Sequence, residues 1–376
     1  MTFLRRLGGA AAICAIFVPC TSSDAADESK NAALAYWQAF AQLPQTDKKH
    51  DELLRDVAKG EIDERAIGLI KQSDGAMQCL RRASAMPRCE WGLDLSAGPH
   101  MVMPHLSKAR QMARFACLHA RQSFQADQTD AALETLGNTL LMARCLGEDQ
   151  ILISLLVQYA IEHMVIDVLT QELTDLDAAH LDALTERLDG LPKGGSLRAA
   201  FEFEQRIYVG WARRAVRESE DDAQAVQTLR SIVAESATDE NPLPHVSREQ
   251  ITKWLDGTWS DYSEILKLLD ESPDARKEKW GALQQRVRAE NPFSAVVLPG
   301  LGPCCEVRDK NTAIRALFKA AIVIARDGSK RVPGLRDPFG DGSFGYKETT
   351  GGFRLWSQLE FRGKRVELAV GSVEKN

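Results

Sequence analysis

The sequence has few of the residues that mark unstructured, fibrous or nucleic-acid-binding chains. Its 376 residues include 26 glycines and 14 prolines, too few for a low-complexity or collagen-like chain. It also has no excess of positive charge, because 47 lysines and arginines face 53 aspartates and glutamates, giving a net charge of −6. A surface without a basic excess argues against a nucleic-acid partner, since phosphate contacts need lysine and arginine.

Beyond the N-terminal segment the sequence also lacks an uninterrupted apolar run of about 18 residues, which excludes a membrane bundle. The nearest approach is residues 151–169, which also carry polar side chains such as Gln158 and Glu162. This mixture predicts a helix buried in the protein interior. With 44% hydrophobic and 27% charged residues, the composition is that of a globular protein with two domains or one elongated array.

The first 26 residues have the pattern of a secretory signal peptide. A basic pair at 5–6 precedes an apolar stretch at 7–18, and small residues follow at 23–25. We therefore expect export to the periplasm or the extracellular space, with no transmembrane helix in the mature chain. Two alternatives stay open, an uncleaved N-terminal anchor and lipidation at Cys20, although Pro19 stands where a lipobox has a small residue.

Six cysteines lie beyond the signal segment, and an even number in an exported chain permits disulfides. Cys79 and Cys89 are close in sequence and form the pair that we expect first. Cys117 and Cys145 fall on apolar faces of neighbouring expected helices, where they either form a bridge or remain small buried hydrophobic residues. The chain has no C-x-x-C motif and no Cys/His cluster at zinc spacing, so we expect no metal site.

Apolar residues recur at helical spacing over most of the chain, with capping residues and prolines between the periodic segments. The expected helices are long and their connections are short, which is the pattern of antiparallel helical hairpins. We therefore predict a mainly α fold. Residues 27–217 are expected to form an N-terminal array of hairpins, arranged as an α-solenoid or a bundle.

The second half of the chain divides into three segments by composition. Residues 218–245 are acidic and then rich in loop-forming residues, so we expect a flexible linker. Residues 246–308 are expected to contain helices and then a Pro/Gly-rich loop at 291–305. Residues 309–376 are expected to form a long helix followed by a small antiparallel β-sheet, because glycine, aromatic and alternating residues replace the helical spacing from Asp337.

The expected strands of this sheet are residues 345–347, 352–359 and 364–370. On the second strand Phe353 and Leu355 share one face, since successive side chains of a strand point to opposite sides. We expect this face to pack on the preceding long helix, where Phe318 and Ile322 lie on the apolar side.

The apolar segment 151–169 carries polar residues at helical spacing. Tyr159, His163 and Asp167 follow one another at intervals of four residues, so they share one helix face. An aspartate beside a histidine raises the basicity of the imidazole, as in a general base. The alternative is a local ion pair on the helix flank. Because no nucleophile or second carboxylate is spaced to join them, we predict no catalytic residue.

A second polar line on the same segment contains Glu162 and Gln158. These side chains could meet Arg144 or Arg114 on a neighbouring helix, and the two arginines stay open as partners. The candidate ligand-binding residues are Glu162, His163, Arg114 and Tyr159.

No cofactor is predicted. The G-x-G-x-x-G spacing at 340–345 has the glycines of a dinucleotide loop, but a proline precedes it and strands are expected to follow, so we interpret it as a turn. Asp337 and Asp341 could hold a calcium ion, but calcium takes six to eight oxygen ligands, and the alternative that we expect is that Asp337 caps the turn at Pro338. His105 and His119 would lie about 21 Å apart on one helix, too far to share a metal ion.

Several pieces of the chain resemble one known group of proteins. The residues NAALAYW at 31–37, Phe40, LP at 43–44, CEW at 89–91 and the block 104–206 resemble exported helical proteins of planctomycete-type bacteria. The resemblance implies an exported bacterial protein built from helical hairpins. It brings no activity with it.

The C-terminal part is similar to a second family. DPFG at 337–340, Tyr346 and GFRLWS at 352–357 resemble the end of the major pseudopilins of type II secretion. That resemblance implies a long helix followed by a three-stranded sheet with an Asp-Pro-aromatic turn. The family binds calcium through acidic residues after the strand, whereas this chain has QLEFRGKR at 358–365, so calcium binding is not carried over. The N-terminal prepilin motif is also missing.

These features predict an exported, non-catalytic scaffold or protein-interaction protein of the cell envelope, with an envelope protein or peptide as its partner. Helical hairpins offer an extended surface for such a partner, and the sequence has no G-x-S-x-G, Walker, H-E-x-x-H or EF-hand motif. The alternative is an enzyme or a small-ligand-binding protein with a pocket between helices. Trp91, Pro99 and His100 form one place where such a pocket could lie.

Overall fold

The computed structural model describes residues 30–55, 62–234 and 246–371. The expected signal segment at 1–26 and the end of the expected linker at 235–245 lie outside the described residues. Within the described ranges the chain is mainly helical, and three strands near its C-terminal end form one antiparallel sheet. The predicted fold class is therefore confirmed.

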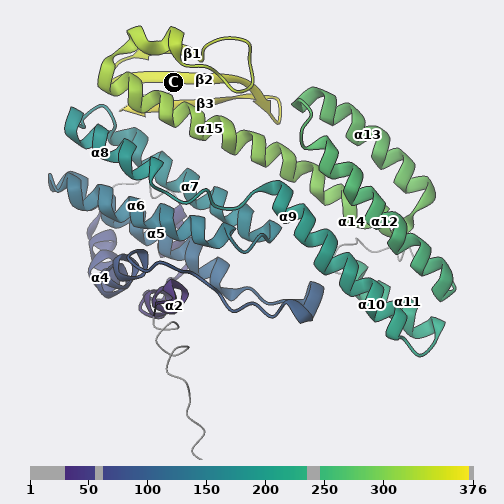
Figure 1. Cartoon of the computed structure of the whole chain (residues 1–376). Coiled ribbons are helices and arrows are strands. Elements are labelled where there is room, and N and C mark those ends of the chain that lie inside the picture. Colours follow the sequence, from purple (N-terminus) through teal and green to yellow (C-terminus); the bar gives the residue numbers. More distant parts are fainter. Residues whose placement is uncertain (1–29, 56–61, 235–245, 372–376) are drawn as a thin grey trace, which may run out of the picture.

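The first half of the chain forms a group of helices packed side by side (Figure 1). Polar side chains cap several of these helices: the Asn31 side chain accepts a hydrogen bond from the backbone N–H of Ala33, and Asp63 caps the helix that follows it. The elements are α2 (Ala32–Ala41), α3 (Lys48–Arg55), α4 (Glu64–Ser84), the 3-10 helix η1 (Leu95–His100), α5 (Pro104–Gln125), α6 (Thr129–Gly147), α7 (Leu152–Glu172) and α8 (Ala178–Asp189). Because α4 contacts both α5 and α6, and α5 contacts both α6 and α7, the packing is that of a bundle.

The second half adds another group of helices beside the first (Figure 1). Its elements are α9 (Leu197–Glu204), the π-helical turn η2 (Gln205–Val209), α10 (Gly210–Glu218), α11 (Asp222–Ala234), α12 (Arg248–Leu268), α13 (Pro273–Glu290), α14 (Pro292–Val297), η3 (Leu298–Gly300), α15 (Leu301–Asp327) and η4 (Ser329–Gly334). Helix α15 contacts α13 and α9 in this group and α7 and α8 in the first group. It therefore joins the two halves of the molecule.

Helix α7 is the one described helix that is long and apolar enough to cross a membrane. Two thirds of its apolar window (67%) is buried inside the protein. It packs against α5, α6, α15 and strand β3. An apolar helix that packs against several other elements is expected in the interior of a fold, which is the position predicted from residues 151–169.

The segment expected to be a linker, residues 218–245, differs from the prediction because part of it is helix α11. The Asp221 carboxylate accepts a hydrogen bond from the backbone N–H of Gln224 (2.8 Å) and so caps this helix. The buried side chains of Val226 and Leu229 pack with residues of α10 and α12. The acidic residues that suggested a linker thus lie at a helix N-terminus, where negative charge is stabilising.

The expected Pro/Gly-rich loop at 291–305 is also mostly helical. Asn291 caps α14 by accepting hydrogen bonds from the N–H groups of Phe293 and Ser294 (3.2 Å each). Pro292 and Pro299 lie in the first turns of α14 and η3. Proline fits a first helical turn because its missing N–H has no partner there in any case. These prolines therefore start helices where the sequence suggested an interruption.

The sheet contains β1 (Gly345–Thr349), β2 (Gly352–Phe361) and β3 (Lys364–Gly371) in the order β1-β2-β3, all antiparallel. Leu355 stands opposite Tyr346 on one side and Leu368 on the other. The predicted packing is confirmed, since Phe353 and Leu355 are buried in one cluster with residues of α15, including Phe318 and Ile322.

Asp337 fixes the turn before the sheet, as predicted. Its carboxylate accepts hydrogen bonds from the backbone N–H of Phe339 (3.0 Å), the hydroxyl of Ser357 (2.7 Å) and the backbone N–H of Gln358. Both carboxylate oxygens are therefore engaged by protein donors. The glycine-rich residues 340–345 form the turn that leads into β1.

The six described cysteines are free thiols, so neither expected pairing is formed. Cys79 accepts a hydrogen bond from the side-chain amide of Gln42 (3.1 Å), whereas Cys89 lies in the loop after α4. Cys117 and Cys145 point into two different hydrophobic clusters, which keeps them apart. The sequence distance between cysteines was a poor guide because packing gives each cysteine its own neighbours.

Candidate functional site

The polar side chains predicted on α7 form a buried network. Glu162, only 1% exposed, makes an ion pair with Arg144 of α6 (Nε to Oε1, 3.0 Å) and accepts a hydrogen bond from Gln158 (2.8 Å). Asn311 of α15 donates to the second carboxylate oxygen (3.4 Å). The guanidinium that meets Glu162 is thus that of Arg144. These contacts do not include Arg114, which lies half-buried on α5.

A loop closes this network from outside. The backbone N–H of Gly195 donates to the Gln158 side chain (3.0 Å), and Arg144 donates to the carbonyl of Lys193 (2.5 Å). Only glycine allows the approach, because a Cβ at position 195 would lie 2.5 Å from the carbonyl oxygen of Gly147. The network is therefore sealed between α6, α7 and this loop.

The other two predicted residues on α7 are also held by neighbours. Burial and the charge of Lys310 lower the pKa of His163 to about 4, and its ring contacts Asn311. Burial and the charge of Glu162 raise the pKa of Tyr159 to about 12. Both groups are therefore neutral at physiological pH. None of Glu162, His163, Arg114 and Tyr159 lines the three cavities described below.

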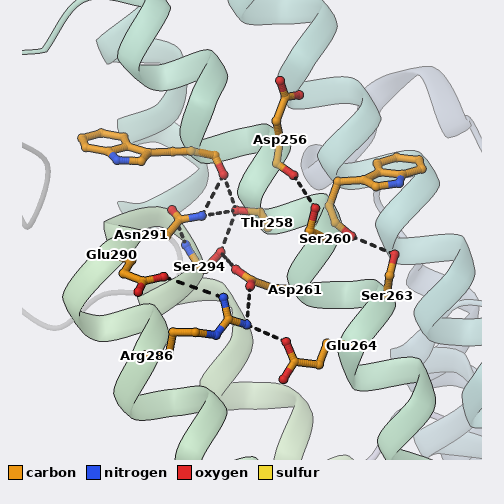
Figure 2. Close-up of polar contacts among 12 residues, drawn as sticks. Asp256, Thr258, Ser260, Asp261, Ser263, Glu264, Arg286, Glu290, Asn291 and Ser294 are labelled. Carbon is orange, nitrogen blue, oxygen red and sulfur yellow. Dashed lines mark hydrogen bonds and ion pairs between the residues drawn. The ribbon is translucent and has the colours of Figure 1, made fainter.

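Figure 2 shows a second polar network, which joins α12, α13 and α14. The buried Asp261 carboxylate accepts from the hydroxyl of Ser294 (2.7 Å) and from Arg286 (2.9 Å). The network comprises Thr258, Asp261, Glu264, Arg286, Glu290, Asn291 and Ser294. Since these groups bond to one another and the network runs from buried hydroxyls out to surface carboxylates, we interpret it as the joint that holds α14 against α12 and α13.

A cavity of about 630 Å³ lies beneath the loop of residues 86–95, between this loop, α2, α4 and α6. Its volume is in the range of small-molecule sites. Its walls combine apolar side chains with charged and thiol groups. The lining residues that matter for its chemistry are Tyr36, Arg88, Cys89, Glu90, Trp91, Leu141, Cys145, Glu148 and Asp149.

Two adjacent residues fasten the loop over this cavity, one to α2 and the other to α6. The Asn31 side chain donates to the carbonyl of Glu90 and accepts from its N–H (2.9 Å each), which ties the loop to α2. The indole N–H of Trp91 donates to the carbonyl of Cys145 on α6 (3.4 Å). Gly92 follows with a φ of +68°, a left-handed conformation that glycine adopts without strain.

Buried polar atoms gather beside this cavity. His105, stacked on Trp91 (4.7 Å between ring centres), lies 3.7 Å from the Asp149 carboxylate. The two atoms that face each other are Nε2 of His105 and Oδ2 of Asp149. Among the described residues, these two atoms and the Tyr36 hydroxyl have no hydrogen bond of ordinary geometry. Burial raises the pKa of Asp149, and His105 partly opposes that rise. Burial and the neighbouring Asp149 raise the pKa of Glu148.

Two further cavities lie elsewhere in the described part of the chain. One of about 580 Å³ lies between α6 and α8 and is lined by Glu134 and Arg187, among others. The other, about 630 Å³, lies between α13, the start of α15 and the β2–β3 turn, and its buried Arg276 and Asp309 form an ion pair. Among the described residues no group of three or more His, Cys, Asp or Glu side chains is placed to hold a metal ion.

Sequence reasoning drew attention to residues 89–91, which include Trp91, but it missed Asp149 and the position of His105 beside the pocket. No local pattern connects the last two residues, which come from the end of the α6–α7 connection and the start of α5. Of the three residues expected to line a pocket, Trp91 does so, whereas His100 packs edge-on against Trp211. No protein-family model, curated protein or solved structure matches this chain.

Glu204 is a separate titrating group at the π-helical turn. Burial raises its pKa from 4.5 to about 7, although a hydrogen bond with Tyr262 opposes the rise. In the unfolded chain this carboxyl loses its proton near pH 4.5, whereas in the folded protein it keeps the proton until about pH 7. The free energy of unfolding should therefore fall as pH rises through this window, by about 2 kcal/mol, since partial solvent access reduces the full effect.

The variant Glu204→Gln removes this titration. We expect it to be more stable than wild type at pH 8 by about 2 kcal/mol and similar to it at pH 4.5, measured by urea unfolding. The exposed neighbour Glu202 supplies the control, because Glu202→Gln should leave the pH profile unchanged. Identical pH profiles for Glu204→Gln and wild type would contradict the assignment.

Proposed function

We propose that the protein is an exported binding protein whose site is the pocket beneath residues 86–95 and whose ligand carries a positive charge on an apolar body. The observation that carries the proposal is the pair of adjacent carboxylates, Glu148 and Asp149, at a cavity whose walls also include apolar side chains. Export rests on the basic, apolar and small-residue pattern of the first 26 residues.

The charges at the pocket favour a cation. Burial raises the pKa values of both Glu148 and Asp149, because it removes water that would stabilise their ionised forms. A positively charged group placed beside them would stabilise the ionised forms in place of that water. The cationic lining residue Arg88 already faces Glu90 (3.6 Å) at the exposed side. A ligand ammonium or guanidinium group would therefore meet carboxylates in the pocket, and its apolar part would meet the side chains of Leu141 and Trp91.

The pocket supports binding better than catalysis. Contact with Cys145 and burial raise the pKa of the Cys89 thiol, so little of it is thiolate at neutral pH. A cysteine nucleophile needs the opposite, a lowered pKa beside a positive charge. The lining residues include no serine or threonine hydroxyl. These features support a non-catalytic role.

Three isosteric probes test the proposal: phenethylamine, phenethyl alcohol and phenylacetate. Calorimetric titration should show that the amine binds with a Kd on the order of 0.1 mM, while the neutral and anionic probes bind at least about tenfold more weakly. Glu148→Gln should weaken amine binding about tenfold, because it removes one charge-assisted contact. The affinity should rise with pH as the two carboxyls ionise.

Glu134 provides the matched control, since it lies on α6, the helix that ends just before Glu148, and lines a different cavity. Glu134→Gln should bind the amine as wild type does. Equal binding of the amine and the alcohol, or equal losses in the two glutamine variants, would overturn the proposal.

A protein partner is the second candidate, and one observation favours it. The large apolar side chains that are exposed among the described residues lie on α2, in η1, in the loop before α5 and at the start of α7. They are Leu34, Trp37, Leu95, Val102 and Ile153. A crosslinked pull-down from the native cell envelope that recovers a partner at equal stoichiometry would support this function over small-ligand binding.

A further inference from the structure

Cys89 and Cys145 come together at the pocket although they are far apart in sequence. Both line the cavity, and Cys89 packs against the hydrophobic cluster that contains Cys145. Cys145 is also the largest single influence on the pKa of the Cys89 thiol, which fits two thiols that lie next to each other. The two sulfur atoms thus face each other between the 86–95 loop and α6.

The backbone holds this encounter in place from both sides. The residue after Cys89 is clamped to Asn31 through two hydrogen bonds (2.9 Å each), and the next residue, Trp91, donates to the carbonyl of Cys145 itself (3.4 Å). The loop is therefore fixed to α2 and α6 at the positions that flank the thiols. A disulfide between Cys89 and Cys145 would therefore join two segments that these hydrogen bonds already hold together.

We infer that Cys89 and Cys145 form a disulfide bond when the folded protein meets a disulfide oxidant, and that this bond ties the loop over the pocket to α6. The oxidant is itself a disulfide, of an oxidoreductase or of glutathione. The thiolate of Cys89, the more exposed of the two, attacks one oxidant sulfur and releases the first thiol. Cys145 then attacks Cys89 in the mixed disulfide and releases the second thiol. Two cysteine thiols are oxidised and one oxidant disulfide is reduced, with both protons passing to the released thiols.

The other described cysteines are placed differently. Cys79 belongs to the same hydrophobic cluster as Cys145, but it does not line the cavity, and its sulfur accepts a hydrogen bond from the Gln42 amide (3.1 Å). Cys117 is fully buried in a separate cluster. Cys304 and Cys305 lie in the first turns of α15 within a third cluster. The inference does not rest on the proposed ligand, because the pairing follows from the contacts of the loop. The raised pKa of Cys89 slows the exchange at neutral pH but does not decide its equilibrium.

The experiment oxidises the folded protein with oxidised glutathione at a pH of about 8.5, where exchange is faster. Free thiols are then alkylated under denaturing conditions, and the unreduced chain is digested and mapped by mass spectrometry. We expect one linked pair of peptides, containing Cys89 and Cys145, and the loss of two free thiols per chain. The oxidised protein should melt about 5 °C higher than the reduced protein, because the bridge restricts the unfolded chain.

Two variants separate the pairing from general reactivity. Cys145→Ser should abolish both the linked peptide and the rise in Tm, whereas Cys79→Ser should keep both. A Cys79–Cys89 peptide in oxidised wild type, or the absence of any Cys89–Cys145 peptide, would overturn the inference. Loss of the bridge with unchanged amine binding would leave the proposed ligand site standing, so the two ideas fail separately.

Discussion

Replacing Glu162 with alanine is expected to lower the free energy of unfolding by about 3–5 kcal/mol, the largest effect among these predictions. The substitution leaves the Arg144 guanidinium, which is 5% exposed, buried without its carboxylate partner. It also removes the carboxylate that accepts hydrogen bonds from Gln158 and Asn311. The bond from Asn311 joins α15 to α7, so this link between the two helices is lost. Chemical unfolding followed by circular dichroism would measure the change.

An exposed ion pair provides the comparison for Glu162. Lys319 and Asp189 lie 2.8 Å apart, but both side chains are about 60% exposed (62% and 60%). Asp189→Ala should therefore cost less than about 1 kcal/mol. Replacing both Arg144 and Glu162 with methionine should recover much of the loss, because no unpaired charge then remains. A loss below 1 kcal/mol for Glu162→Ala would show that the network does not hold α7 in place.

Leu355→Ala is the second large effect, with an expected loss of about 2–5 kcal/mol. Leu355 is fully buried where β2 packs on α15, in the cluster that contains Phe318. Its removal leaves a cavity between the sheet and the helix that joins the two halves of the molecule. Thermal and urea unfolding would measure the loss.

The control for Leu355 lies on the same strand. Glu360 is exposed, so Glu360→Ala should change the free energy of unfolding by less than about 0.5 kcal/mol. If Leu355→Ala is equally mild, the sheet does not depend on its packing against α15.

The small sheet could be predicted closely because its signal is local. Alternation of buried and outward side chains along β2 needs only neighbouring residues, and Asp337 before Pro338 marks the turn by its own chemistry. The helices were equally visible from apolar spacing. The structure adds only a few residues to the predicted ends of the strands.

The predictions of the loop at 291–305 and of the linker at 218–245 were wrong because one residue type can indicate two different structures. Proline ends a helix in its interior but begins one in its first turn, so Pro292 and Pro299 were taken for a loop. Acidic residues mark linkers and also helix N-termini, so the capping role of Asp221 was missed. Spacing along the chain does not resolve either ambiguity, because packing decides it: α11 packs with α10 and α12, and α14 packs with α12 and α13.

The pocket could not be predicted as a unit. Its walls come from α2, the 86–95 loop and the end of α6, and the sequence does not show which of these segments meet. Reasoning from helix faces selected Glu162 instead, because a carboxylate on an apolar helix is unusual. Its partner Arg144 turned a candidate ligand group into an internal ion pair.

The most direct test of the pocket as the binding site is the nuclear magnetic resonance signal of the Trp91 indole N–H. This group lies in the pocket wall and donates to Cys145, so an amine bound there must change its environment. Trp280 lines the cavity beside α13 and serves as the internal control. Titration with phenethylamine should move the Trp91 signal, assigned through Trp91→Phe, with the affinity found by calorimetry, and leave the Trp280 signal in place. Movement of Trp280 alone, or of neither signal, would contradict the proposed site.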